Sequence, residues 1–275
     1  MKIATWNVNS IRARIINFLD FIKEFKPDVV LIQELKCINE QFPFFDLETM
    51  NYNIEVYGEK ARNGVAILSK FPLYDIKKGL PLYDIVDSDD EARYIEACFD
   101  YDGKVIKVAS IYVPNGGPSA NDIKAGIKDE TKTYNFEKKM KFCDRLVKKF
   151  QETIKDGDIA FFGGDYNVCP NLNMDVYSIK KDGAITCTEQ ERTKFQELLN
   201  TGMIDIWRKL NPNLKEYSWW GYRPFYMWEK NLGYRLDAFL ITPNTEKIVK
   251  NCKIYAQETR SKEKASDHVP MMCEI

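Results

Sequence analysis

Residues 159–167, IAFFGGDYN, decide the fold class of this chain. The first four residues are apolar, so a strand here would be apolar on both faces, as strands buried between two layers are. Gly163 and Gly164 then let the backbone turn sharply, and Asp165 and Asn167 follow. The segment therefore predicts a buried strand that delivers a carboxylate and an amide to a crevice at its carboxyl end.

Short apolar runs of the same kind, bounded by Gly, Pro, Asn or Asp, are spread along the whole chain. We expect further strands in residues 2–8, 28–34, 65–70, 105–114, 236–242 and 268–275. Segments with helical spacing of apolar residues separate these runs, and no linker or repeat interrupts them. The alternation predicts a single α/β domain over residues 1–275.

Three helices are predicted by their spacing and their end signals. The first follows Ser10 as N-cap and stops at Lys26 and Pro27, and the third begins with the Thr188 and Glu191 capping box and ends at Gly202. The second covers residues 136–154 and carries five lysines, which we interpret as a solvated face in preference to a phosphate-facing patch: Lys138, Lys139, Lys141, Lys148 and Lys149.

Composition limits the function classes. Lys and Arg together number 40 against 41 Asp and Glu, so no global field draws the chain to nucleic acid or anionic lipid, and any polyanion-binding face must be local. Apolar runs are too short for a membrane span, and the first residues do not resemble a signal peptide. Seven cysteines without a CxxC pair indicate reduced, buried thiols. We expect a cytoplasmic protein, nucleoid-associated if bacterial or archaeal, and nuclear if eukaryotic.

Polar side chains follow four of the predicted strands, at the sheet edge where α/β proteins build their sites. Singly, most have an ordinary explanation as a turn, strand-exit or core residue, whereas Asp165, directly after Gly163 and Gly164, is less easily explained in this way. Together the oxygen donors form a hard set that suits Mg²⁺, with Mn²⁺ as a substitute, and does not suit zinc. Such sites usually serve phosphate chemistry. The set consists of Asn7, Glu34, Asp165, Asn167 and Asp267, with Tyr112 nearby in the pattern.

His268, in SDHVP, is the only histidine of the chain. Alone it is weak support for catalysis, because most histidines beside a carboxylate are ordinary hydrogen-bonded residues. Its meaning depends on the other polar positions.

Several blocks carry a family resemblance. IATWNVNSIRAR, VLIQELK, NGVAILSK, IYVPNG, GGDYNVCP, TEQERTKFQELL, YSWWGYR, GYRLDAFLIT and SDHVPM, in this order, resemble the exonuclease III type of apurinic/apyrimidinic endonuclease, within the endonuclease/exonuclease/phosphatase superfamily. The blocks extend across essentially the whole chain. The resemblance implies a four-layer α/β sandwich, in which two packed mixed β-sheets are flanked by helices and the site lies where loops of both sheets meet.

The resemblance also implies a role for each matching position. Glu34 matches the principal metal ligand with Asn7 beside it, and Asp165 and Asn167 match the residues that activate and hold the attacking water. Tyr112 matches a phenol near the scissile phosphate, proposed as a transition-state stabiliser or a phenolate. Asp267 and His268 match the terminal pair at the metal and phosphate. Asp237 matches the carboxylate that orients the imidazole, and such a partner would keep His268 protonated.

An aromatic segment from Trp219 to Tyr234 suggests where DNA binds. It is a plain core segment on one interpretation, but the resemblance places Trp219, Tyr234 and Leu236 in an apolar pocket for an extruded abasic sugar. Candidates for other DNA contacts are Arg93 and Arg223, and more weakly Arg12, Lys36 and Lys60; Phe225 belongs to the same aromatic segment. Gly221 stands where many bacterial relatives have an acidic residue, and residues 116–133 form a longer connection than is usual.

We therefore expect a Mg²⁺-dependent, monomeric repair nuclease that acts on double-stranded DNA with abasic sites, not on membranes. It would cut 5′ to the lesion and leave a 3′-hydroxyl, with 3′→5′ exonuclease and 3′-phosphodiesterase as further activities. One alternative is a phosphoinositide phosphatase or sphingomyelinase of the same superfamily. Another is an inert DNA-binding protein on this fold.

Overall fold

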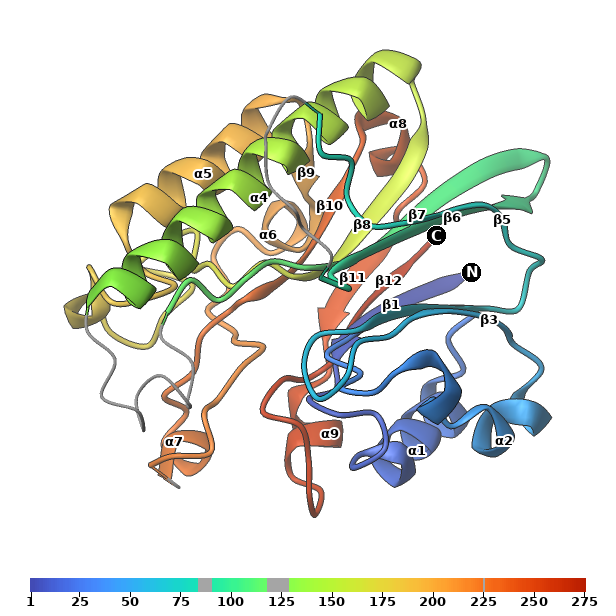
Figure 1. The fold of residues 1–275 in the computed structure, drawn as a ribbon, viewed down its shortest axis with the longest axis horizontal. Helices are drawn as coiled ribbons and strands as arrows, with labels where there is room; N and C mark the ends of the chain where they lie inside the picture. Colours follow the sequence, from blue (N-terminus) through green and yellow to red (C-terminus); the bar gives the residue numbers. More distant parts are fainter. Residues whose placement is uncertain (84–90, 118–128, 225) are drawn as a thin grey trace.

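The computed structural model describes residues 1–83, 91–117, 129–224 and 226–275. Its strands form two six-stranded mixed sheets that pack face to face (Figure 1). The first sheet has the order β11-β12-β1-β2-β4-β3, and the second has the order β5-β6-β7-β8-β10-β9. Parallel pairing joins β1 to β2 and β7 to β8, so the carboxyl ends of these strands lie at the same edge of each sheet.

The strand bounds explain the two sheets. The first sheet contains β1 (Lys2–Asn7), β2 (Val29–Gln33), β3 (Asn53–Tyr57), β4 (Val65–Ser69), β11 (Asn251–Ile254) and β12 (Met271–Glu274). The second contains β5 (Tyr74–Lys78), β6 (Tyr94–Tyr101), β7 (Lys104–Tyr112), β8 (Ile159–Asp165), β9 (Ile204–Asp205) and β10 (Asp237–Ile241). All seven predicted strands are present. We did not predict β3, β5, β6, β9 and β11, because they are short or carry charged side chains.

Helices form the two outer layers. In Figure 1, α4 (Asp129–Asp156) and α5 (Glu189–Asn200) lie side by side over one sheet, while α1 (Ile15–Phe25) and α2 (Phe44–Leu47) lie on the opposite side of the molecule. Over the described part of the chain, the remaining short helices are α6 (Ile206–Leu210), α7 (Tyr226–Glu229), α8 (Pro243–Glu246) and α9 (Ala256–Arg260). Three single turns of 3₁₀ helix cover Asn39–Gln41, Glu48–Met50 and Ile179–Lys181. Within the described ranges, none of the helices combines the length and apolar character that crossing a membrane needs.

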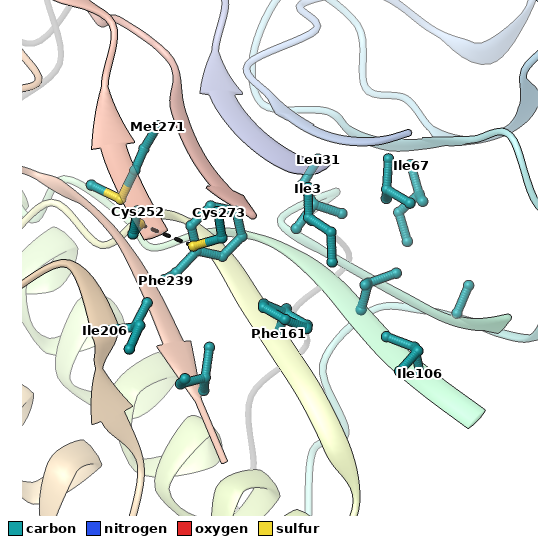
Figure 2. Packing of buried hydrophobic residues seen from close by; sticks show 14 of the residues in the cluster. Ile3, Leu31, Ile67, Ile106, Phe161, Ile206, Phe239, Cys252, Met271 and Cys273 are labelled. Carbon is teal, nitrogen blue, oxygen red and sulfur yellow. Dashed lines mark hydrogen bonds between the residues drawn. The ribbon is translucent and has the colours of Figure 1, made fainter. Parts of the chain in front are cut away.

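Apolar side chains fill the space between the sheets (Figure 2). Ile3, Leu31 and Ile67 of the first sheet pack in one cluster with Phe161 and Phe239 of the second. Separate clusters bury α4 and α5 against the second sheet and α1 against the first. The predicted four-layer sandwich is confirmed. Truncation of one of these core side chains to alanine would cost roughly 2–5 kcal/mol.

All seven cysteines are buried and have free thiols, as predicted. Cys252 and Cys273 pair across β11 and β12, with 2.9 Å between their sulfur atoms (Figure 2).

Two predictions about the helices were wrong. The first helix begins at Ile15 and not after Ser10, because the Ser10 amide donates to the Glu34 carbonyl at 2.8 Å and ties this turn to the end of β2. The lysines of α4 are not all solvated, since Lys139 and Lys149 are buried and pair with Glu191 and Glu96.

The capping box of Thr188 and Glu191 is present, as is the end of α5 before Gly202. The expected long connection at 116–133 falls partly on residues 118–128, which lie outside the described part of the chain, as does Phe225; residues 129–133 belong to α4.

Candidate active site

The two sheets bring their polar strand ends to one place. Tyr112 at the end of β7 pairs in register with Asp165 at the end of β8, and Asp165 pairs in turn with Asp237 at the start of β10. Asn7 ends β1 in the other sheet, and its Nδ2 donates to Asp165 Oδ2 at 2.9 Å across the interface between the sheets. The predicted acceptors therefore converge because parallel strands end at a common edge.

Glu34, Asp165 and His268 form the centre of this site. Each offers one ligand atom, and these atoms lie within 4.8 Å of one another. Asn7 Nδ2 also donates to Glu34 Oε1 at 3.0 Å, and Lys36 Nζ lies 2.7 Å from Glu34 Oε2. Burial by itself would raise the pKa of Glu34, but Lys36 and Asn7 outweigh burial and lower it. Glu34 is therefore ionised at neutral pH and available to a cation.

His268 is buried and held by two carboxylates. Its Nδ1 lies 2.8 Å from Asp237 Oδ2, and its Nε2 lies 3.5 Å from Asp165 Oδ2. Burial would lower the pKa of His268, but the charges of Asp237 and Asp165 outweigh burial and raise the pKa to about 10. A protonated imidazole has two N–H donors and no lone pair for a metal. This arrangement favours a hydrogen-bond donor over a metal ligand.

Asp165 ends β8, and Asn167 follows it in the next loop. The backbone N–H of Asn167 donates to Asp165 Oδ1 at 2.8 Å, and Asn167 adopts a positive φ of 51°. Burial is the largest influence on Asp165 and raises its pKa, because a buried carboxylate loses its hydration. A carboxyl group whose pKa lies closer to neutrality is better matched to accepting a proton from water.

Tyr112 donates its hydroxyl to Glu34 Oε1 at 2.8 Å. Burial, together with the neighbouring charge of Glu34, raises the pKa of Tyr112 well above its usual value. The ring is covered by the guanidinium of Arg93, whose carbon lies 4.7 Å from the ring centroid. The geometry is that of a neutral phenol that donates a hydrogen bond.

The pocket in front of these groups has a volume of about 380 Å³. Trp219, Tyr234 and Leu236 form an apolar wall, and the rings of Trp219 and Tyr234 meet edge to face at 5.1 Å. Polar residues line the same pocket: Glu34, Tyr112, Asn115, Asp165, Asn167, Asp267 and His268. The three side chains predicted for an apolar pocket therefore share one cavity with the predicted catalytic groups.

Asp267 lines this pocket but lies outside the central trio. Its Oδ1 accepts from Asn9 Nδ2 at 2.8 Å, and its Oδ2 accepts from Trp219 Nε1 at 3.1 Å. These bonds place Asp267 where it fixes the Trp219 ring.

The predicted arginines do not line the pocket. Arg93 lies behind Tyr112 and pairs with Glu91, and Arg223 is exposed beyond Gly221. Arg12 and Lys60 are likewise exposed and lie outside the pocket lining, whereas Lys36 pairs with Glu34.

Sequence reasoning did not identify Asn115 and Lys139 as site residues. Asn115 Nδ2 donates to Asn167 Oδ1 at 3.1 Å, and the IYVPNG block already contained this residue. Lys139 is fully buried on α4, and its ammonium donates to the carbonyl oxygens of Asn115 at 3.1 Å and Asn167 at 2.8 Å, as well as to Glu191. No local signal reveals this lysine, because its contacts are distant in sequence.

Comparison with known proteins shows which family this chain resembles in sequence and in structure. The sequence matches the endonuclease/exonuclease/phosphatase family over residues 4–268. It is 29% identical to exodeoxyribonuclease III of Haemophilus influenzae over 100% of both chains. An AP endonuclease from Archaeoglobus fulgidus superposes with a TM-score of 0.86 at 34% identity, covering 100% of this chain and 99% of the other. A 3′ phosphatase from Neisseria, solved with a product DNA hairpin, gives 0.87 at 29% identity with the same coverage.

Proposed function

The chain belongs to the endonuclease/exonuclease/phosphatase family and is a hydrolytic nuclease of the exonuclease III type, and on that premise we propose its reaction. It hydrolyses the phosphodiester 5′ to an abasic site in duplex DNA, depends on Mg²⁺, and leaves a 3′-hydroxyl. Removal of 3′-terminal nucleotides and of 3′-blocking phosphate groups are further activities of the same site. The observation that carries this proposal is the shared pocket, in which the apolar wall lines the same cavity as the Glu34, Asp165 and His268 centre.

The donor set fits a hard divalent cation. Glu34 and Asp165 offer carboxylate oxygens, and no thiolate lies in the group. We propose that these two carboxylates hold Mg²⁺, for which Mn²⁺ can substitute, with Asn7 orienting both. When bound, the ion neutralises phosphoryl charge.

Asp165 is the proposed base for the attacking water. Its Oδ1 is fixed by the Asn167 amide, and its Oδ2 accepts from Asn7, so the carboxylate cannot rotate freely. Asn167 orients the water or the phosphate from the adjacent position.

His268 is the proposed donor to the phosphate. Asp237 Oδ2 holds Nδ1, which leaves the Nε2 side of the ring toward Asp165 and the pocket. A protonated imidazole there stabilises negative charge that develops on the phosphoryl oxygens. Tyr112 lines the same pocket, and its hydroxyl, which donates to Glu34 Oε1 in this structure, would add a second donor by turning to the phosphate.

The apolar wall supplies selectivity for an abasic nucleotide. An abasic sugar lacks stacking and base pairing, so its extrusion from the duplex costs less than that of an intact nucleotide. Trp219, Tyr234 and Leu236 offer it an apolar surface, and this wall does not suit an inositol ring. The observation disfavours the phosphoinositide phosphatase alternative, and the complete set of polar groups disfavours an inert DNA-binding protein.

The groups of the site all come from one chain, between Asn7 and His268, so one chain is enough to form the site; we propose that the protein acts as a monomer with a single nuclease domain. We expect it to work in the compartment that holds the chromosome, the cytoplasm or the nucleus.

The test is incision of a labelled duplex that contains one tetrahydrofuran abasic analogue. Wild-type protein should nick the duplex with Mg²⁺ and not with EDTA. Glu34→Gln, Asp165→Asn and His268→Gln should each lower the rate by roughly 10²- to 10³-fold or more. Lys104→Gln, an exposed change at the far end of β7, is the matched control. Folded wild-type protein that hydrolyses inositol phosphates or sphingomyelin, or that binds the duplex without cutting it, would reject the proposal.

A further inference from the structure

A second cavity, of about 330 Å³, is lined in part by residues that are close in sequence to residues of the active pocket. Its lining includes the side chains of Arg14, Arg260, Lys262 and Lys264 around Tyr222, and we name this group the basic pocket. The chain as a whole is nearly neutral, so a local group of four cations is a distinct feature.

Tyr222 organises the basic pocket. Its hydroxyl accepts from Arg14 Nη2 at 2.8 Å and donates to the Ala265 carbonyl at 2.8 Å. The guanidinium carbons of Arg14 and Arg260 lie 5.9 Å and 5.4 Å from its ring centroid. An aromatic ring holds a cation in place without neutralising it. The positive charges are therefore oriented and retained.

Two carboxylates, Asp20 and Asp267, offset only part of the positive charge of this group. Among the residues that the structure describes, Arg14, Arg260 and Lys264 form no ion pair, and Lys262 reaches only Asp20, at 3.4 Å. The Nε atoms of Arg14 and Arg260 are buried without an acceptor in the same ranges. Burial also lowers the pKa of Arg260, which indicates a cation partly stripped of water. An anion bound here would offset that cost.

The basic pocket and the active pocket share two chain segments. Ala265 lines the first and Asp267 lines the second, so these residues are at most about 7.6 Å apart between Cα atoms. Tyr222 likewise follows Trp219 closely in the same loop. One strand of duplex DNA presents a phosphate about every 3.4 Å along its axis. A duplex seated on the active pocket therefore has flanking phosphates within reach of the four cations.

We propose that the basic pocket binds a backbone phosphate of the DNA that flanks the abasic nucleotide. This inference rests on the proposed function, because it takes duplex DNA as the substrate. The interaction fixes the register of the duplex on the active pocket and adds affinity, and it reads no base. It should therefore strengthen binding of damaged and undamaged duplexes alike.

The first test measures binding of abasic and undamaged duplexes in EDTA, so that no incision occurs. Lys264→Gln removes an exposed, unpaired charge, and Arg14→Gln is a second variant that alters a different wall. The affinity of wild type for duplex DNA should fall by some factor when salt rises from about 50 to about 200 mM. In a variant that has lost one phosphate contact, this factor should be about 3.5 times smaller. Lys104→Gln removes the same charge roughly 26 Å from Tyr112 along β7 and should leave this factor unchanged.

The second test neutralises single phosphates of the abasic duplex as methylphosphonates. At one position close to the lesion, the methylphosphonate should weaken the binding of the duplex by wild type. The Lys264→Gln variant should bind this duplex as well as it binds the unmodified one. Unchanged salt dependence in both variants, or the absence of such a position, overturns the inference. Competition by inorganic phosphate that Lys264→Gln abolishes, with duplex binding unchanged, would show a small-anion site and also overturn it. Failure of the proposed function would appear separately, as absence of incision by wild type with Mg²⁺.

Discussion

The protonation of His268 can be measured without ambiguity, because it is the only histidine in the chain. Its imidazole gives one pair of ¹⁵N signals in a protein labelled at histidine. In metal-free protein the two carboxylates overcome burial and raise the pKa to about 10, so both ring nitrogens should carry protons throughout the range from pH 6 to pH 9. The site would then hold a donor, and not a neutral base, at working pH.

Asp237→Asn is the perturbation that tests this assignment. Asp237 contributes the largest share of the carboxylate effect from 2.8 Å, and an opposite charge this close shifts a pKa by roughly 1 to 3. We expect the pKa of His268 to fall by that amount, and the incision rate to decline at a correspondingly lower pH. Asp165 remains 3.5 Å from His268 Nε2 in this variant, so the pKa of His268 should stay above its value in a double variant that also carries Asp165→Asn.

The sign of the stability effect follows from the same shift. A histidine whose folded pKa is raised stabilises the folded state below its unfolded pKa of about 6.5, and this contribution is lost as the pH rises toward 10. Asp102→Asn, a change of the same chemistry at an exposed turn, should leave the titration unaltered. A neutral imidazole in wild type at pH 7.5, or a titration that Asp237→Asn does not move, would refute the reasoning.

Asp165, Lys139 and Gly221 give three further predictions. Burial raises the pKa of Asp165, so ionisation of this carboxyl destabilises the metal-free protein as the pH rises. Asp165→Asn should therefore raise the melting temperature of the metal-free protein at pH 8. The same change should abolish stabilisation by Mg²⁺, which for wild type is about 2.7 kcal/mol at 100 times Kd. Lys139→Met leaves the buried carboxylate of Glu191 without a counter-charge and should cost roughly 3–5 kcal/mol in urea denaturation; a loss below about 1 kcal/mol contradicts this. A side chain at Gly221 would place its Cβ 3.1 Å from the Trp219 ring, so Gly221→Val should slow incision by roughly 10- to 100-fold, and unchanged kinetics would show that the ring position is unimportant.

The sequence predicted the seven strands that are strongly apolar, because burial on both faces leaves a pattern that periodicity can detect. It did not predict β6, where Glu96 faces inward and is neutralised by Lys149 from α4 and Lys77 from β5. A buried charged residue whose partner lies on another element cannot be distinguished, from a single sequence, from a charged residue exposed to solvent. For the same reason Lys139 resembled a surface residue although it holds the loops of Asn115 and Asn167.

The site was predictable in composition and less so in geometry. Strand ends placed Asn7, Glu34 and Asp165 together, since parallel strands finish at one edge. The family resemblance already implied the pairing of His268 with Asp237, and the coordinates add its 2.8 Å distance and the second carboxylate, Asp165, 3.5 Å from Nε2. The basic pocket was not predicted at all, since its cations come from two segments distant in sequence, Arg14 and residues 260–264, and its ring comes from Tyr222.

The central claim is that this pocket hydrolyses DNA at abasic sites with the help of a divalent ion. The most direct measurement is the end chemistry of a labelled duplex that carries one natural abasic site. We expect a single cut immediately 5′ to the lesion, with a 3′-hydroxyl that a DNA polymerase extends, in Mg²⁺ and not in EDTA. A cut that persists in EDTA, or a product that ends in an unsaturated sugar on the 3′ side, would contradict the account.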